Sequence, residues 1–174
     1  MKRVFLKTLV ALAAVAAAGG ALAQDIKERT LKFALVANDG HPAVPGMKKF
    51  AELVQAKSGG KIKVNLFLGG TLGSDQAIVS SLQGGTVEMA VMNSGILSSA
   101  VKELAVFDFP FLFANEKESD AIVDGPVGKK MHQMLEEKGI VGLSYWELGY
   151  RHITNGKRPL NKVEDIEGLK LRVI

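Results

Sequence analysis

The sequence predicts an α/β domain built on a mostly parallel sheet. Stretches with the character of strands alternate with stretches that carry apolar residues at helical spacing, and the glycine pairs Gly59-Gly60 and Gly84-Gly85 separate them. The first strand, residues 30–37, is apolar at almost every position, as expected of a strand buried on both faces. This order of elements is typical of parallel strands covered by helices.

The remaining elements are predicted in chain order from periodicity and capping residues. Met47, Phe50 and Leu53 repeat at helical spacing, whereas apolar and polar residues alternate between Lys61 and Phe67. The full set is a helix over 44–57, a half-exposed strand over 61–67, a helix after a cap at Ser74, a strand over 87–92, helices over 118–123 and 126–138, a strand over 140–146, and a capped turn from Val163 that leads into a strand carrying Arg172.

Residues 1–23 predict a secretory signal peptide. Lys2, Arg3 and Lys7 form a basic head, an apolar run follows, and Ala21-Leu22-Ala23 is a small-x-small motif, so we expect cleavage after Ala23. The apolar run is shorter than the roughly 20 residues that a membrane-spanning helix needs. An uncleaved anchor or a mitochondrial presequence stays open as an alternative. The expected mature chain, residues 24–174, would be periplasmic and would not insert into the membrane.

Composition excludes several classes of function. Leaving out Lys2, Arg3 and Lys7 lowers the formal net charge from +4 to +1, so no nucleic-acid partner is implied. The chain has no cysteine, which excludes disulfides and zinc-thiolate sites and suits an exported bacterial protein. His41, His132 and His152 do not show metal-ligand spacing, and His132 falls in a predicted surface helix. We therefore expect no metal and no cofactor.

Catalytic motifs are missing as well. The stretch "GGTLGSD" is glycine-rich but lacks the GxxxxGK[ST] pattern of a phosphate-binding loop, and neither a GxSxG motif nor a cysteine nucleophile is present. The sequence therefore argues against an enzyme.

Polar and aromatic residues follow the predicted strands at the end where α/β sheets bind ligands. Asn38 and His41 come after the first strand, Asn93 follows the third, and residues 146–151 follow the fourth. Because carboxyl ends of parallel strands meet at one edge, these residues are candidates for one site.

Arg151 and Arg172 are the candidates for carboxylate recognition. A planar guanidinium held on a strand suits bidentate binding of a carboxylate. The alternatives are a solvated strand residue for Arg172 and a guanidinium stacked on a nearby ring for Arg151. Spacing alone does not show that the two arginines converge.

A series of motifs resembles the extracytoplasmic solute-binding proteins of TRAP transporters, the DctP family. The motifs are "GGTLGSDQAIVSSLQGGTVEMAVMNSG", "ELAVFDFPFLF", "GPVGKKM" and "LGYRHITNGKRPLNKVEDIEGLKLRV", and the match runs from about Leu31 to Val173. The resemblance implies a periplasmic-binding-protein-like fold of two α/β lobes that close on an organic acid. It also implies delivery of that acid to a permease made of two membrane subunits.

The resemblance also implies roles for single residues. Arg172 matches the arginine that binds the ligand carboxylate, and Arg151 matches a second contact. The other residues that it places around the ligand are Asn93, less surely Ser94, the walls Trp146 and Tyr150, and more weakly Asn38 and His41.

Family members are considerably longer than this chain. Residues 24–147 would form most of lobe one, and residues 148–174 would start lobe two, so we expect a fragment of a longer protein. Three alternatives stay open: a protein that presents a ligand to a membrane sensor, a non-functional remnant and, least favoured, a periplasmic enzyme. Dicarboxylates, keto acids and sugar acids all remain possible ligands.

Overall fold

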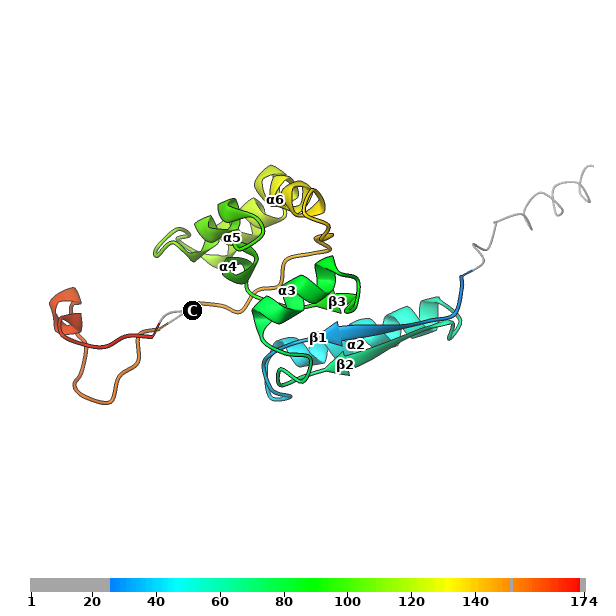
Figure 1. Ribbon diagram of the computed structural model, residues 1–174. Helices are drawn as coiled ribbons and strands as arrows, with labels where there is room; N and C mark the ends of the chain where they lie inside the picture. The colour runs from blue at the N-terminus through cyan, green and yellow to red at the C-terminus, as the bar shows by residue number, and fades with distance from the viewer. Residues whose placement is uncertain (1–25, 151, 173–174) are drawn as a thin grey trace, which may run out of the picture.

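The computed structural model describes residues 26–150 and 152–172 (Figure 1). The predicted signal peptide and Arg151 lie outside the described residues. The elements, with the labels of Figure 1, are β1 (Arg29–Ala34), α2 (Ala43–Lys57), β2 (Ile62–Phe67), α3 (Asp75–Gln83), β3 (Met89–Ala90), α4 (Ser94–Leu97), η1 (Lys102–Asp108), α5 (Glu116–Val123), α6 (Pro126–Glu136) and η2 (Val163–Ile166), of which η1 and η2 are 3-10 helices.

The sheet is parallel and has the strand order β2-β1-β3. β1 and β2 pair along their whole length, from Arg29 opposite Ile62 to Ala34 opposite Phe67. β3 pairs with β1 only through Met89 and Ala90. The predicted α/β class with a parallel sheet is therefore confirmed.

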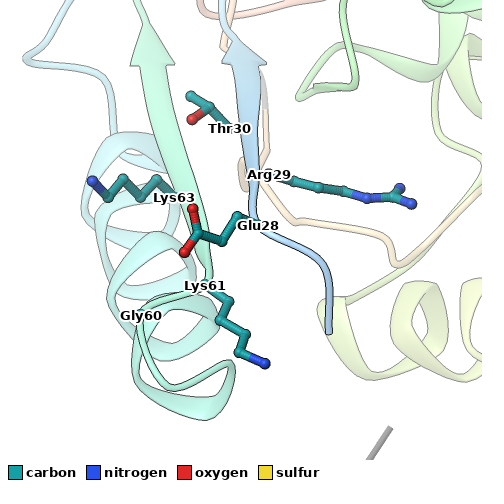
Figure 2. Close-up of a pocket in the computed structure, with 6 residues that line it drawn as sticks. All are labelled: Glu28, Arg29, Thr30, Gly60, Lys61 and Lys63. Carbon is teal, nitrogen blue, oxygen red and sulfur yellow. The ribbon is translucent and has the colours of Figure 1, made fainter. Parts of the chain in front are cut away.

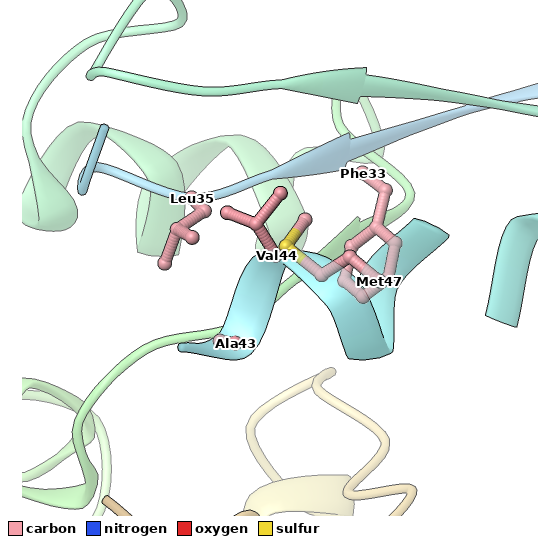
Figure 3. Packing of buried hydrophobic residues seen from close by; sticks show 5 residues of the cluster. All are labelled: Phe33, Leu35, Ala43, Val44 and Met47. Carbon is pink, nitrogen blue, oxygen red and sulfur yellow. The ribbon is translucent and has the colours of Figure 1, made fainter. Parts of the chain in front are cut away.

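Helices cover both faces of the sheet where β1 ends. On one face Phe33 and Leu35 pack against Val44 and Met47 of α2, which Figure 3 shows from close by. On the other face Ala34 packs with Ile78 of α3 and with Val87, so the carboxyl half of β1 is buried between two helices. A third cluster joins α3 to η1 and α6, and its buried members are Val79, Val101, Leu104, Leu135 and Ile140.

Local signals read from the sequence set the helix ends. The Ser74 side chain accepts a hydrogen bond from the Ala77 N–H at 3.4 Å and begins α3, as predicted. Gly59 and Gly60 have φ of 61° and 81° just after α2, a conformation that glycine adopts at little cost. Asn115 caps α5 in the same way as Ser74 caps α3, through the Glu118 N–H.

Four predicted strands differ in the structure. Residues 30–37 were expected to be buried on both faces, but Thr30 and Lys32 are exposed and burial begins at Phe33. The predicted strand over 87–92 is reduced to Met89–Ala90. Residues 140–146 and the segment that carries Arg172 are not strands. The physical reason is pairing, because neither segment has a strand beside it among the described residues.

The final described segment lies apart from the core. None of residues 152–172 is buried, and Figure 1 shows this segment extending away from the helices and the sheet. The predicted capped turn is present there as η2, because the Asp165 carboxylate accepts the backbone N–H groups of Asn161 and Lys162. Local hydrogen bonds hold this turn without help from a core.

Candidate ligand-binding site

The loop after β1 places two candidate residues at the start of α2. The His41 N–H donates to the Asn38 carbonyl at 3.0 Å, and His41 Nδ1 accepts the Ala43 N–H at 3.2 Å. Ala43 is the first residue of α2, so His41 satisfies one of its free backbone donors. An imidazole that accepts at Nδ1 carries its proton on Nε2 when it is neutral, which leaves Nε2–H as a donor.

Asn38 lies over the turn that follows β2. A Cβ placed on Gly69 would lie 3.0 Å from Asn38 Oδ1, and Gly69 has φ of 65°. The turn is tied to this loop because the Gly69 N–H donates to the Ala37 carbonyl at 2.8 Å. Glycine at position 69 therefore leaves room for the Asn38 amide.

Trp146 packs on the same end of α2. A Cβ placed on Gly46 would lie 3.0 Å and 3.2 Å from two carbons of the Trp146 ring, so the ring contacts the helix backbone directly. The indole N–H donates to Ser144 Oγ at 3.0 Å, and 39% of Trp146 remains exposed. His41 and Trp146 thus each contact the first turns of α2, although they are distant in sequence.

Asn93 emerges at the same edge of the sheet. β1 and β3 are parallel neighbours, and the Val91 N–H donates to the Ala34 carbonyl at 3.0 Å, just before Asn93. Asn93 is half-buried, precedes Ser94 in α4, and makes no capping hydrogen bond with its side chain. Its amide is therefore not used to hold the local fold of the described chain.

Arg172 is not joined to these residues. It is exposed, it lies outside the strands, and among residues 26–150 and 152–172 no hydrogen bond or ion pair holds it. Tyr150 is 52% exposed. The structure thus places His41 and Trp146 at the start of α2 and Asn38 on the turn after β2, and among the described residues it brings Arg172 into no hydrogen bond or ion pair with them.

A carboxylate beside Trp146 was missed by sequence reasoning. Partial desolvation, together with the charges of Glu116 and Asp120 in α5, raises the pKa of Glu147. Desolvation raises the pKa of Tyr150, and the negative charges of Glu116, Glu147 and Glu118 raise it further. The signal in the sequence was the row of acidic residues that opens α5, but sequence does not show that this row faces residues 147–150.

His132 was expected on a helix surface, and the structure corrects this. It is half-buried, and its ring stacks on Tyr145 with centroids 4.6 Å apart and planes 6° apart. The Tyr145 hydroxyl donates to the Gly128 carbonyl at 3.0 Å, and burial raises the pKa of this phenol. His132 is therefore a packing residue between α6 and the segment that leads to Trp146.

The structure also contains a cavity of about 370 Å³ away from these residues. It lies at the amino ends of β1 and β2, and Figure 2 shows its lining, which is Glu28, Arg29, Thr30, Gly60, Lys61 and Lys63. In the figure Arg29 points away from Lys61 and Lys63. No candidate residue lines this cavity, and parallel sheets bind ligands at the opposite edge.

The described residues offer neither a metal cluster nor a membrane-spanning helix. Within residues 26–150 and 152–172, no group of three or more His, Cys, Asp or Glu side chains could hold a metal ion. No helix in the same part of the chain is both long enough and apolar enough to cross a membrane.

Residues 33–174 match the DctP family, described as bacterial extracellular solute-binding protein, family 7. The chain belongs to this family. Its members are solute-binding proteins rather than enzymes. The resemblance carried by the sequence motifs is thereby confirmed, and so is the expectation that this is not an enzyme family.

Solved relatives share the fold over most of the chain. A TRAP periplasmic solute-binding protein from Ochrobactrum anthropi is 55% identical with a TM-score of 0.79, over 85% of this chain and 46% of that protein. The sugar acid binding protein of Advenella mimigardefordensis, in complex with galactonate, is 43% identical with a TM-score of 0.82, over 86% of this chain and 48% of that protein.

Relatives with a stated ligand include binders of a sugar acid, galactonate, and of dicarboxylates. The 2,3-diketo-L-gulonate-binding periplasmic protein of Escherichia coli is 38% identical over 125 residues, which is 72% of this chain and 38% of that protein. This chain thus spans less than half the length of these relatives.

Proposed function

We propose that this chain is part of the periplasmic solute-binding component of a TRAP transporter, and that its ligand is an organic acid of the sugar-acid kind. The observation that carries the proposal is the match with the galactonate-binding protein, at 43% identity and a TM-score of 0.82. Delivery of the acid to the membrane subunits of a permease is part of the same proposal. So is periplasmic location after cleavage at Ala23.

The described contacts support a ligand at the carboxyl edge of the sheet. His41 offers Nε2–H, Asn38 and Asn93 offer amides, and Trp146 offers an apolar face held on Gly46. Hydroxyl groups of a sugar acid need such neutral donors and acceptors, and an aromatic face suits its C–H groups. These residues bind and orient the ligand, and no bond is made or broken.

The ligand carboxylate is assigned to Arg172, with Arg151 as a second contact. A guanidinium can donate two parallel hydrogen bonds to a carboxylate, which an ammonium cannot do in the same geometry. In this assignment residues 24–147 form most of one lobe and residues 148–174 belong to a second. Arg172 would therefore hold the ligand from the side opposite His41 and Asn38.

The exposure of Arg172 limits the affinity of this chain. An exposed ion pair contributes at most about 1 kcal/mol, compared with about 1.5–3 kcal/mol for a sheltered hydrogen bond to a charged group. Millimolar binding corresponds to a binding free energy of about 4 kcal/mol. One exposed arginine–carboxylate pair and a few neutral hydrogen bonds can supply this amount. We therefore expect millimolar binding by this chain.

Thermal unfolding of the purified chain tests the proposal. With a Kd of about 1 mM, 10 mM galactonate would stabilise the folded state by about 1.4 kcal/mol and raise Tm by about 3–6 °C. Galactitol, in which a CH2OH group replaces the carboxylate, should raise Tm by less than half as much, because the exposed carboxylate contact supplies about 1 kcal/mol of the binding free energy. Succinate tests the dicarboxylate alternative.

Two arginine variants distinguish a specific contact of Arg172 with the ligand carboxylate from a non-specific effect of positive charge. Arg172→Lys should reduce the galactonate shift by up to about half, whereas Arg29→Lys, at the opposite edge of the sheet, should keep it in full. An undiminished shift in Arg172→Lys would refute the arginine assignment. No shift with any acid would refute binding by this chain.

A further inference from the structure

The carboxylate of Asp108, the last residue of η1, lies directly against the backbone of α4. A Cβ placed on Gly95 would clash with Asp108 Oδ2 and would lie 2.8 Å from Asp108 Cγ. Gly95 is a helical residue and is not among the glycines with positive φ. Glycine is therefore needed at position 95 to make room for the carboxylate, and not because of the backbone conformation.

The contact with Gly95 places Asp108 close to Asn93. α4 begins directly after Asn93, so Gly95 follows that residue at a distance of two positions in the chain. The residues just before Asn93 and Asp108 are Met92 and Phe107, and both pack against the same buried cluster. Shared packing therefore holds the end of η1 next to the end of β3.

A second contact joins the end of η1 to the segment that carries Trp146. The Phe107 ring meets the Tyr145 ring edge to face, with centroids 5.9 Å apart and planes at 67°. Tyr145 directly precedes Trp146 and is itself held by its stack on His132. Direct contacts thus link the end of η1 to the segments that carry two of the residues proposed to bind the ligand.

The carboxylate of Asp108 can accept hydrogen bonds from a hydroxylated ligand. Asp108 is exposed, and among residues 26–150 and 152–172 no hydrogen bond or ion pair holds it. An ionised carboxylate has about four acceptor positions and no donor. It can therefore accept from a ligand hydroxyl even when a side chain of a longer protein also donates to it. A second carboxylate on the ligand, by contrast, would be repelled.

We propose, on the basis of the function proposed above, that Asp108 is a specificity-determining residue for sugar acids. It accepts a hydrogen bond from the hydroxyl end of the ligand, whereas the ligand carboxylate is assigned to Arg172. A sugar acid with one carboxylate fits this pair of opposite charges. A dicarboxylate of the same length places two negative charges together at Asp108, and such repulsion is a common source of specificity.

Galactonate and galactarate form a matched pair of ligands, because galactarate carries a carboxylate where galactonate has its terminal CH2OH group. Thermal unfolding of the purified chain over a range of concentrations of each acid gives the two dissociation constants. We expect galactonate to bind about fivefold more tightly than galactarate, which is the ratio that an exposed charge contact can supply. Asp108→Asn keeps the size of the side chain and removes its charge, so it should lower this ratio to about one.

Two further variants make the result specific to this carboxylate. Glu103→Gln removes the same charge from the other end of η1, where Glu103 is exposed, and should keep the ratio of the wild type. Asp108→Ala, which leaves more space at Gly95, should lower the ratio as Asp108→Asn does. Because Asp108 is exposed, neither of its substitutions should change Tm in the absence of ligand.

The outcomes separate the role of Asp108 from the proposed function. A galactonate shift in the wild type, with an unchanged ratio in Asp108→Asn and Asp108→Ala, would overturn the specificity role and leave the proposed function intact. An equal loss of the ratio in Glu103→Gln would also overturn it, because the effect would then be one of general charge. Absence of any galactonate shift in the wild type would refute the proposed function, and the role of Asp108 with it.

Discussion

Replacement of Gly46 by alanine tests how α2 and Trp146 are joined. In a helix interior, alanine is favoured over glycine by about 1 kcal/mol, so an isolated site should gain that amount. For a chain of 174 residues this corresponds to a rise in Tm of about 2–4 °C. The added Cβ, however, would lie 3.0 Å from the Trp146 ring, which is closer than a relaxed contact.

The ring is expected to move rather than the helix. Trp146 lies in residues 141–150, whose backbone makes no hydrogen bonds with the described residues, whereas α2 is held by the core around Met47. If the ring shifts enough to expose on the order of 40 Å² of apolar surface, the loss is about 1 kcal/mol. The two effects nearly cancel, so we expect Gly46→Ala to change Tm little.

Fluorescence and a double-mutant cycle separate the two contributions. Trp146 is the only tryptophan in the sequence, so its emission reports on this contact alone and should shift to the red in Gly46→Ala. In a Trp146→Ala background, Gly46→Ala should recover the full gain of about 1 kcal/mol, which is a coupling of similar size. Gly40→Ala, with open space around the new Cβ, is the control and should leave the emission unchanged. Unchanged emission in Gly46→Ala, with a full gain in stability, would refute the contact.

Three further outcomes follow from the same structure. Met47→Ala, at a fully buried site, should lower the free energy of unfolding by about 2–5 kcal/mol, as measured by chemical denaturation. Leu53→Ala, on the exposed side of α2, should lower it much less. Equal losses for the two variants would contradict the described core. Ser74→Ala should cost about 1 kcal/mol by removing the cap of α3, and Ser74→Asp should retain most of the stability. The raised pKa of Glu147 means that the folded state binds its proton more readily than the unfolded state, so this residue lowers stability as pH rises from its unfolded pKa through its raised folded pKa. Glu147→Gln should remove that part of the pH dependence of Tm, and an unchanged profile would contradict the assigned desolvation and repulsion.

Local periodicity was enough to predict most helices and the paired strands. The alternation from Lys61 to Phe67 became β2, and the apolar spacing from Met47 to Leu53 became α2. Ser74 could be assigned as a cap because its hydrogen bond to Ala77 closes within the same turn. Such features depend on residues that are neighbours in sequence, so the sequence contains all the information they need.

Strand length was not predictable in the same way. Residues 140–146 have the apolar pattern of a strand, yet they pair with no strand among the described residues. Likewise, β3 is paired only at Met89 and Ala90, although the apolar pattern is longer. A strand exists only where another segment supplies hydrogen bonds, and the sequence of one segment does not contain that partner. The short helices α4 and η1 show no extended apolar period, and no prediction was made for them.

For the candidate site, the sequence by itself determined the family and the residues at the strand ends, because parallel strands put Asn38 and Asn93 at one edge. Only the tertiary structure decided that Trp146 lies on Gly46, that His41 accepts from the start of α2, and that His132 packs on Tyr145 rather than facing solvent. Each of these contacts joins a side chain to a backbone or ring whose position depends on the packing of whole elements. Sequence patterns determine which elements form, whereas contacts between elements follow from how their buried faces fit together.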